Sequence, residues 1–243
     1  MSDLGTPIDV PACSAFVADA SIPPLTLCVV PFRLTNNGLE VGTVRRSDLV
    51  WLPGTDPAAE ETLDDGARRT ICSTPRSCHH YIEQLYTFSL NGSGFRQIMI
   101  SYLALFRETL SPHEDTKADI EWWPTDTVRL NRPLDRTVLD YAIMRLRAKL
   151  GYTNIAFHLM PPSFTLTELQ HAYECVLEHP VDKRNFRRRM TATGILDDTG
   201  EKRREGSHRP AALYQFASRD DQAAWLTPPW ALERLGTDVE EKE

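Results

Sequence analysis

The first half of the chain alternates short apolar runs with polar turns, a pattern typical of strands. Asn36-Asn37-Gly38 is a hairpin-turn signal between two of these runs. One segment differs, because Leu63, Ala67 and Ile71 lie four residues apart and predict a helix over residues 62–73. The pattern therefore predicts a mixed α/β region with strands at residues 25–34, 39–45, 81–88 and 97–106.

The second half of the chain is helical in pattern. Its first predicted helix carries an apolar stripe formed by Leu139, Ile143, Leu146 and Leu150. A second helix is expected over residues 163–177, where Thr165 and Glu168 have the spacing of a capping box. The proline-containing segment 122–133, which precedes both helices, is expected to be a linker between two modules.

A short basic helix is expected next. Five of the seven residues from Lys183 to Arg189 are Lys or Arg. Asp182 has the position of an N-cap, Val181 and Phe186 have the spacing of a hydrophobic staple, and Gly194 stands where a left-handed C-terminal residue belongs. These local signals predict a stable helix with its charges outward.

The neighbours of the basic helix complete a pattern. Only residues 178–181 separate it from the preceding helix, a turn short enough for a helix-turn-helix. A turn signal at 195–200 and a basic loop at 201–209 then precede the apolar run 211–216, which predicts a two-stranded wing. From Asp182 to Arg209, nine Lys and Arg outnumber five Asp and Glu. The segment predicts a winged helix-turn-helix that binds double-stranded DNA.

Charge strengthens this interpretation. The chain has 243 residues and a net charge of -7, so positive charge gathered on one helix suits phosphate neutralisation. The alternative to DNA binding is that these charges form a solvated basic helix end.

No apolar run is long enough to span a membrane, and the N-terminus does not resemble a signal peptide. With five scattered cysteines, we expect a cytoplasmic protein, and a zinc site at Cys72, Cys78, His79 and His80 is not favoured.

The basic residues divide by expected role. Candidates for contacts with base edges are Asn185 and Arg188 or Arg184. Candidates for phosphate contacts are Lys183, Arg187, Arg203, Arg204 and Arg209, together with Thr165 and Thr167 at the start of the preceding helix.

The first module carries a broken sequence box. Glu61 and Arg69 stand at the separation that they have in the Nudix box, and the strand–turn–strand before them, ending in Arg45-Arg46 and Leu52-Pro53-Gly54, also resembles a Nudix domain. The other box positions depart from the family: Thr55 and Arg76 replace glycines, and Thr70, Ser73 and Thr74 replace the three metal-binding glutamates. Neutral hydroxyls cannot replace the carboxylates that hold Mg²⁺, so the resemblance implies a Nudix fold with no metal, no catalytic residues and no enzymatic activity.

The second module resembles the winged helix of the Nudix-related transcriptional regulators of NAD metabolism, the NrtR group with its relative NadQ. The segments that carry the resemblance are 164–170, 173–174, 182–188 and 209–214. It covers roughly residues 25–216 and implies an α+β fold: an αβα Nudix-like sandwich followed by a winged helix-turn-helix. The expected domains are a lead-in at 1–24, a ligand-sensing domain at 25–126, a DNA-binding domain at 127–218 and a tail at 219–243.

The resemblance also implies a small-molecule effector, either ADP-ribose, NAD or ATP, and no cofactor. The residues expected to hold it are Arg45, Arg46, Glu83, Gln84, Phe88 and Arg96. Structural alternatives stand beside these roles, since Arg45 or Arg46 can pair with Asp48, and Phe88 can belong to the core. For Arg69, a salt bridge with Asp65 is favoured over a catalytic role.

We therefore expect a homodimeric repressor of NAD biosynthesis or salvage genes that binds a palindromic operator and responds to an adenine nucleotide. Two alternatives remain. One is a surviving Nudix-type nucleoside diphosphate hydrolase with a basic tail that binds nucleic acid. The other is a DNA-binding protein whose Nudix remnant is purely structural.

Overall fold

The computed structural model describes residues 23–217, except residues 74–80, 92–95, 108–116, 118, 152, 193 and 205–209 and the side chains of 90, 91 and 96. Several expectations fall outside this part of the chain: those for the lead-in, the tail, Thr74, Arg76, Cys78, His79, His80, Arg209 and the side chain of Arg96.

The first module is built on a seven-stranded sheet. Four of its strands match the predicted ones: β1 (Leu25–Thr35), β2 (Gly38–Arg46), β5 (Tyr81–Asn91) and β6 (Arg96–Phe106). The others are β3 (Leu49–Trp51), β4 (Gly54–Thr55) and β7 (Ile120–Pro124). The order is β3-β2-β1-β6-β5, with β4 paired to β1 and β7 to β2. Among the described strands of this sheet, only β1 and β6 pair in parallel. Gly38, at φ 124°, makes the predicted hairpin turn possible.

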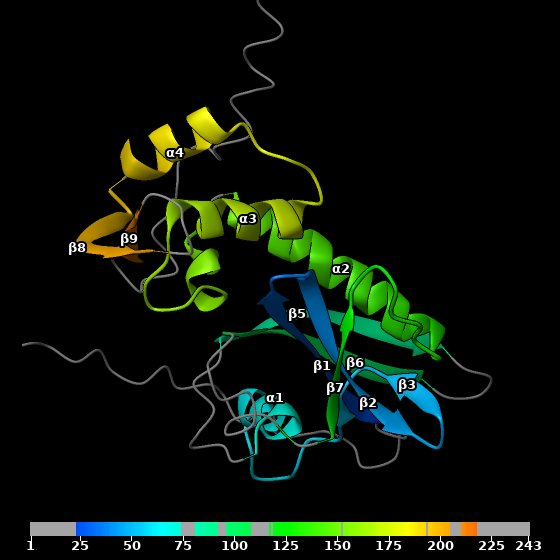
Figure 1. Cartoon of the computed structure of the whole chain (residues 1–243). Coiled ribbons are helices and arrows are strands. Elements are labelled where there is room, and N and C mark those ends of the chain that lie inside the picture. The colour runs from blue at the N-terminus through cyan, green and yellow to red at the C-terminus, as the bar shows by residue number, and fades with distance from the viewer. Residues whose placement is uncertain are drawn as a thin grey trace, which may run out of the picture.

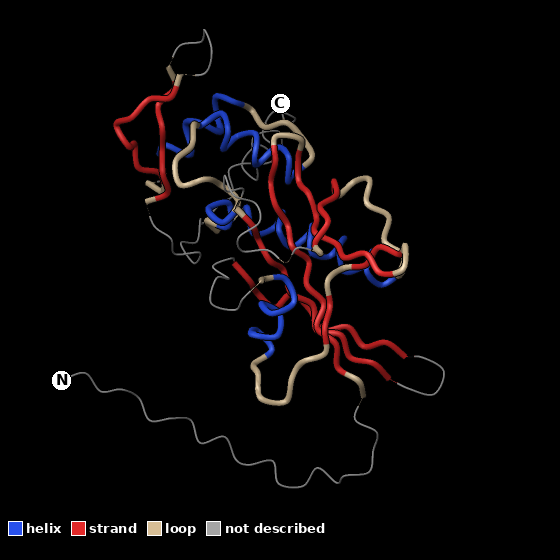
Figure 2. The backbone as a smooth tube through the Cα atoms, turned by 60° about the horizontal axis from the view of Figure 1, so that its bottom comes forward, coloured by secondary structure: helices blue, strands red, loops and turns tan. Residues whose placement is uncertain are grey.

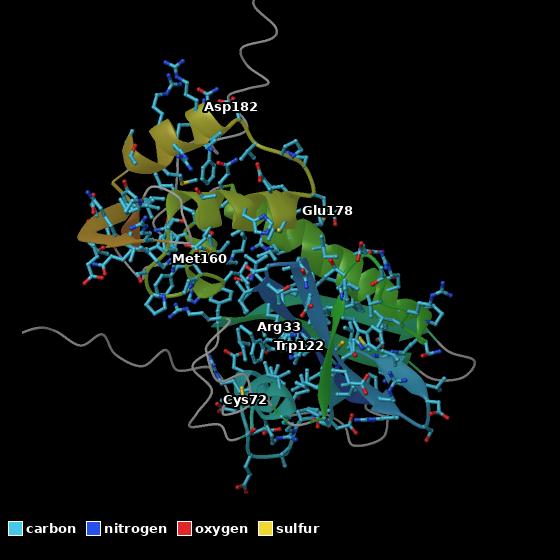
Figure 3. All side chains as sticks on the ribbon, in the orientation of Figure 1. Arg33, Cys72, Trp122, Met160, Glu178 and Asp182 are labelled. Atoms are coloured by element: carbon cyan, nitrogen blue, oxygen red, sulfur yellow. The ribbon has the colours of Figure 1, made fainter. Side chains whose placement is uncertain are left out.

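The expected linker at 122–133 was partly wrong. Its first residues belong to β7, which pairs with β2 and places Trp122 opposite Gly42. A Cβ on Gly42 would lie 2.8 Å from the side chain of Ile120, so only glycine leaves room for this strand. The guanidinium of Arg33 lies 4.6 Å from the centre of the Trp122 ring, and the two side chains are neighbours in Figure 3. The tryptophan is therefore a sheet residue.

Helices cover both faces of the sheet (Figure 1). Helix α1 (Leu63–Ile71) begins after the N-cap Thr62 and buries Ala67 and Ile71 against β1 and β6. Helix α2 (Pro133–Leu150) lies across the opposite face, where Leu139 and Leu146 join the core of β1 and β6. The αβα sandwich is the predicted architecture.

The second module follows α2. It contains the 3-10 helix η1 (Ile155–His158), α3 (Leu166–Leu177), α4 (Lys183–Ala192), β8 (Leu196–Arg203) and β9 (Ala211–Phe216). Figure 2 shows the β8–β9 ribbon set apart from the large sheet. Hydrogen bonds of 2.9 and 2.8 Å between the backbones of Phe164 and Tyr214 fasten β9 to the start of α3.

One detail of the predicted wing was wrong. The turn signal at 195–200 lies mostly within β8, where the register shifts between Asp198 and Lys202 and Gly200 has a φ of 77°. The glycine therefore makes an irregularity inside the strand, and Lys202 and Arg203 are strand residues.

The two modules share one hydrophobic core. Residues of α2, α3 and α4 pack in the same cluster as the α2-facing side of the sheet. Helix α2 contacts both β1 of the sheet and α3 of the second module. The expected domain boundary between residues 126 and 127 therefore stays a prediction. In the part of the chain that is described, no helix is long and apolar enough to cross a membrane.

Candidate functional site

Helix α3 begins with the predicted capping box. The Thr165 hydroxyl accepts a hydrogen bond from the Glu168 amide at 3.2 Å, and the Glu168 carboxylate accepts one from the Thr165 amide at 2.7 Å. Thr165 is only 7% exposed, so its hydroxyl serves the helix. Thr167, two residues further along the chain, is exposed. Of these two candidates for phosphate contacts, Thr167 is the accessible one.

The turn between α3 and α4 is short and fixed at both ends. Glu178 ends α3 in the left-handed region at φ 58°. The Val181 amide donates to the Glu174 carboxylate at 3.0 Å. The Asp182 carboxylate accepts from the Asn185 amide at 2.7 Å, which confirms the predicted N-cap. Figure 3 shows Glu178 and Asp182 at the two ends of this turn. The geometry is that of a helix-turn-helix.

Helix α4 turns its apolar residues inward and its charges outward, as predicted. Phe186 and Met190 are buried, and the Phe186 ring lies 5.2 Å from the ring of Tyr173 on α3. Lys183, Arg184 and Arg188 are exposed. Because two buried anchors fix the rotation of the helix, its basic face is presented in a defined orientation.

The exposed face joins three elements. Arg187 of α4 donates to the Thr167 hydroxyl at 2.8 Å, and Arg188 donates to the Asn185 side chain at 3.0 Å. Arg203 of β8 forms an ion pair with Glu168. The start of α3, the outer face of α4 and the wing therefore form one surface. We call it the basic face, and its described cations are Lys183, Arg184, Arg187, Arg188, Arg203 and Arg204.

The remnant of the Nudix box forms a structural clamp. Arg69 donates from Nε to the Glu61 carboxylate at 2.9 Å and from its other nitrogens to the Thr55 hydroxyl and the Asp56 carbonyl, at 3.2 and 3.1 Å. The expected pairing of Arg69 with Asp65 was wrong, because Asp65 accepts from the N-cap hydroxyl of Thr62 at 2.7 Å. The Arg69 guanidinium lowers the pKa of Glu61 to about 2.

Thr70, at the first of the positions where the Nudix box has a metal-binding glutamate, does not fit Mg²⁺. The Thr70 hydroxyl is buried and donates to the Gly66 carbonyl of its own helix at 2.8 Å. Within the described ranges, no group of three His, Cys, Asp or Glu side chains could hold a metal ion. A neutral hydroxyl that is buried against its own helix offers Mg²⁺ none of the negative charge that a glutamate would supply.

A pocket of 360 Å³ lies where the β2–β3 turn, β4 and the start of α2 meet. It is lined by Thr26, Arg46, Trp51, Leu52, Gly54, Thr55, Asp56 and Arg132. Arg46 is exposed and makes no ion pair with any described residue. Arg45 forms two hydrogen bonds of 2.9 Å with the Glu121 carboxylate, so its structural role is a pairing with Glu121 and not the alternative pairing with Asp48. The pocket therefore has one unpaired guanidinium from the sheet.

The ligand residues predicted on β5 lie elsewhere. Glu83 forms an ion pair with Lys149 of α2, and its pKa is lowered because hydrogen bonds from Lys149 and Tyr81 outweigh the effect of burial. Phe88 packs against Tyr86 and Tyr141, with ring centres 5.0 and 6.4 Å apart. Gln84 is exposed beside a β-bulge.

The predicted ligand residues therefore do not converge. Strands β1 and β6 separate β5 from Arg46, which is the only predicted ligand residue with a described side chain that lines the pocket. Trp51 and Arg132 line the pocket but were not among the ligand residues predicted from the sequence. The position of Arg132 directly before Pro133, the first residue of α2, was the signal that could have drawn attention to it.

Comparison with known proteins supports both parts of this description. The family model for the NrtR DNA-binding winged helix domain matches residues 156–216. A curated relative from Acinetobacter baylyi, "ADPR responsive transcriptional repressor NtrR", is 30% identical over 218 residues, which cover 84% of this chain and 86% of the relative.

Solved structures support the same two-part architecture, a Nudix-like sandwich with a winged helix. Shewanella oneidensis NrtR complexed with a 27mer DNA is 28% identical at a TM-score of 0.69, covering 84% of this chain and 98% of that one. A MutT/nudix family protein from Enterococcus faecalis has the same fold, with 18% identity, a TM-score of 0.59 and coverage of 82% and 88%. By its relative, its winged helix and its Nudix-like sandwich, the chain belongs to the NrtR family of Nudix-related transcriptional regulators.

Proposed function

We propose that this protein is a transcriptional repressor of NAD biosynthesis or salvage genes whose DNA binding responds to ADP-ribose. The observation that carries the proposal is the joining of a capped helix-turn-helix, with its basic face outward, to a pocketed Nudix-like sandwich through one core. The Acinetobacter relative is named for its response to ADPR, which favours ADP-ribose over NAD and ATP.

The DNA partner follows from the basic face. Asn185, Arg184 and Arg188 lie on the exposed side of α4 and suit base edges in the major groove, while Lys183, Arg187 and Arg204 suit phosphates. We infer that two copies of the chain pair about a two-fold axis and bind a palindromic operator. Because the relatives are bacterial, the compartment that holds the operator is the cytoplasm.

The Nudix part serves as a sensor without hydrolysis. The Thr70 hydroxyl is committed to Gly66, and the Glu61–Arg69 pair is committed to the loop at 55–61. The rival function, a residual nucleoside diphosphate hydrolase, needs carboxylates at positions 70 and 73, where this chain has Thr and Ser.

The proposal is tested by operator binding with and without nucleotide. Fluorescence anisotropy with the DNA upstream of the genes next to this protein's own gene should show tight, salt-dependent binding. ADP-ribose should change the Kd for this DNA at least tenfold. NAD and ATP serve as comparison ligands at equal concentration. Equal affinity for operator and random DNA, or no response to any of the three nucleotides, would contradict the proposed function.

A further inference from the structure

The effector pocket receives cations from two separate parts of the chain. Arg46 comes from the end of β2, and Arg132 is the residue directly before α2. Both line the same 360 Å³ space, together with Thr26, Thr55 and Asp56. Two guanidiniums in one pocket suit a ligand with two phosphates, because a guanidinium donates charge-assisted hydrogen bonds to phosphate oxygens.

Arg132 is held in place by a buried carboxylate. Its Nε donates to Asp135 at 2.7 Å, and Asp135 is fully buried. The other oxygen of Asp135 accepts from the Leu52 amide at 3.1 Å, and Leu52 itself lines the pocket. Burial raises the pKa of Asp135, although Arg132 opposes that effect. The carboxylate thus ties the first turn of α2 to the pocket wall.

Trp51 completes the wall on this side. The Arg132 guanidinium lies 5.6 Å from the centre of the Trp51 ring. The indole Nε1 of Trp51 is enclosed and has no hydrogen-bond partner among the described residues. A buried donor without a partner is costly, and a ligand oxygen in the pocket would satisfy it. The Arg132 side chain keeps 27% of its surface exposed, so it remains accessible from the pocket.

We propose that Arg132 is a ligand contact that α2 supplies to the effector site, pairing with Arg46 around the diphosphate of a nucleoside diphosphate sugar, and that Asp135 is its positioning residue. This inference rests on the proposed function, since it assigns residues to the same effector. The hydroxyls and the carboxylate of the pocket then face the sugar, whose hydroxyls can donate to Asp56.

The consequence lies at the other end of the helix. Arg147, near the end of α2, donates to the Val176 carbonyl of α3 at 2.8 Å and pairs with Glu178 at 2.6 Å. Glu178 opens the turn that leads to α4. A phosphate bound to Arg132, which Asp135 holds at the start of α2, therefore acts on the same helix that supports the helix-turn-helix. A ligand can shift the equilibrium between two arrangements of α2 only if it binds one of them more tightly than the other. The contact between Arg132 and a phosphate would supply that difference in affinity.

The test is ADP-ribose binding to the full chain by isothermal calorimetry. Arg132→Gln should weaken the binding of ADP-ribose by at least about tenfold, the effect of losing one charge-assisted hydrogen bond, and should leave the Kd of adenosine, which has no phosphate, at its wild-type value. The matched control is Arg136→Gln: Arg136 is one turn along α2, half-exposed, paired with Asp140 at 2.9 Å and outside this pocket.

A second variant guards against misfolding. Removing Arg132 leaves Asp135 buried without its cation, so Arg132→Gln combined with Asp135→Asn should restore thermal stability while keeping the loss of ADP-ribose affinity. If the wild type binds ADP-ribose and both variants bind it equally well, Arg132 is not a ligand contact, and the proposed function stands. If the wild type fails to bind ADP-ribose, the proposed function itself fails.

Discussion

Arg203 of the wing forms an ion pair with Glu168, the residue that closes the capping box of α3. One carboxylate therefore both satisfies the start of a helix and holds a strand that comes much later in the chain. Arg203 is partly neutralised in the free protein, whereas Arg204, the next residue, is exposed. The two arginines are expected to differ in their contribution to DNA binding.

Arg204→Ala should lower the slope of log K against log salt concentration by about 0.9, since one phosphate contact is lost. Arg203→Ala should lower the slope less, because Arg203 must break its ion pair with Glu168 before it can bind a phosphate. The same variant should also weaken the attachment of β8 to α3. Titration of operator and random DNA at several salt concentrations measures both slopes. Identical slopes for the two variants would show that the Glu168 pair has no influence.

Arg188→Ala should relax the sequence preference at one operator position, with a loss of roughly 1–3 kcal/mol of discrimination. The reason is that Arg188 lies exposed on α4, where Asn185 supports it at 3.0 Å. Selection from a randomised operator library measures the preference position by position. Arg136→Ala on α2 is the matched control. A uniform loss across all sequences would instead place Arg188 on the phosphate backbone.

The purified protein should release no more product than buffer from ADP-ribose, NAD or ATP with millimolar Mg²⁺. The physical reason is the commitment of Thr70 to the Gly66 carbonyl and the absence of carboxylates at the neighbouring metal positions. Product chromatography checks the prediction. Turnover that rises with protein concentration and vanishes in Glu61→Gln would overturn it.

The Glu61–Arg69 pair predicts a pH dependence of stability. The folded pKa of Glu61 is about 2, below its ordinary 4.5, because Arg69 hydrogen-bonds the ionised form. The sign follows from linkage: the stabilisation is fully present above pH 4.5 and is lost as the pH falls toward 2. Urea unfolding of wild type and Glu61→Gln should differ at pH 7 and converge on acidification. A difference that grows at low pH would contradict this assignment.

Local signals in the sequence predicted local structure well. The capping box of Thr165, the N-cap at Asp182 and the left-handed Gly194, at φ 68°, depend on residues within one or two turns of each other, so their spacing is sufficient. The Asn-Gly hairpin is predictable for the same reason.

Non-local features could not be predicted in this way. The pairing of β7 with β2 depends on Gly42, far away in the chain, so a proline-containing segment with two tryptophans looked like a linker. The pocket joins Arg46 to Arg132 across the fold. The bulge between Gln84 and Tyr86 also changes which β5 side chains share a face, and this defeats simple alternation.

The shared core of the two modules has a consequence for truncation. A fragment that begins near residue 127 would expose the face of α2 that carries Leu139 and Leu146 and would lose the Lys149–Glu83 ion pair. Such an exposed apolar patch favours aggregation. We therefore expect that the DNA-binding half does not fold alone, and that the full chain melts in a single cooperative transition in which both modules lose their structure together.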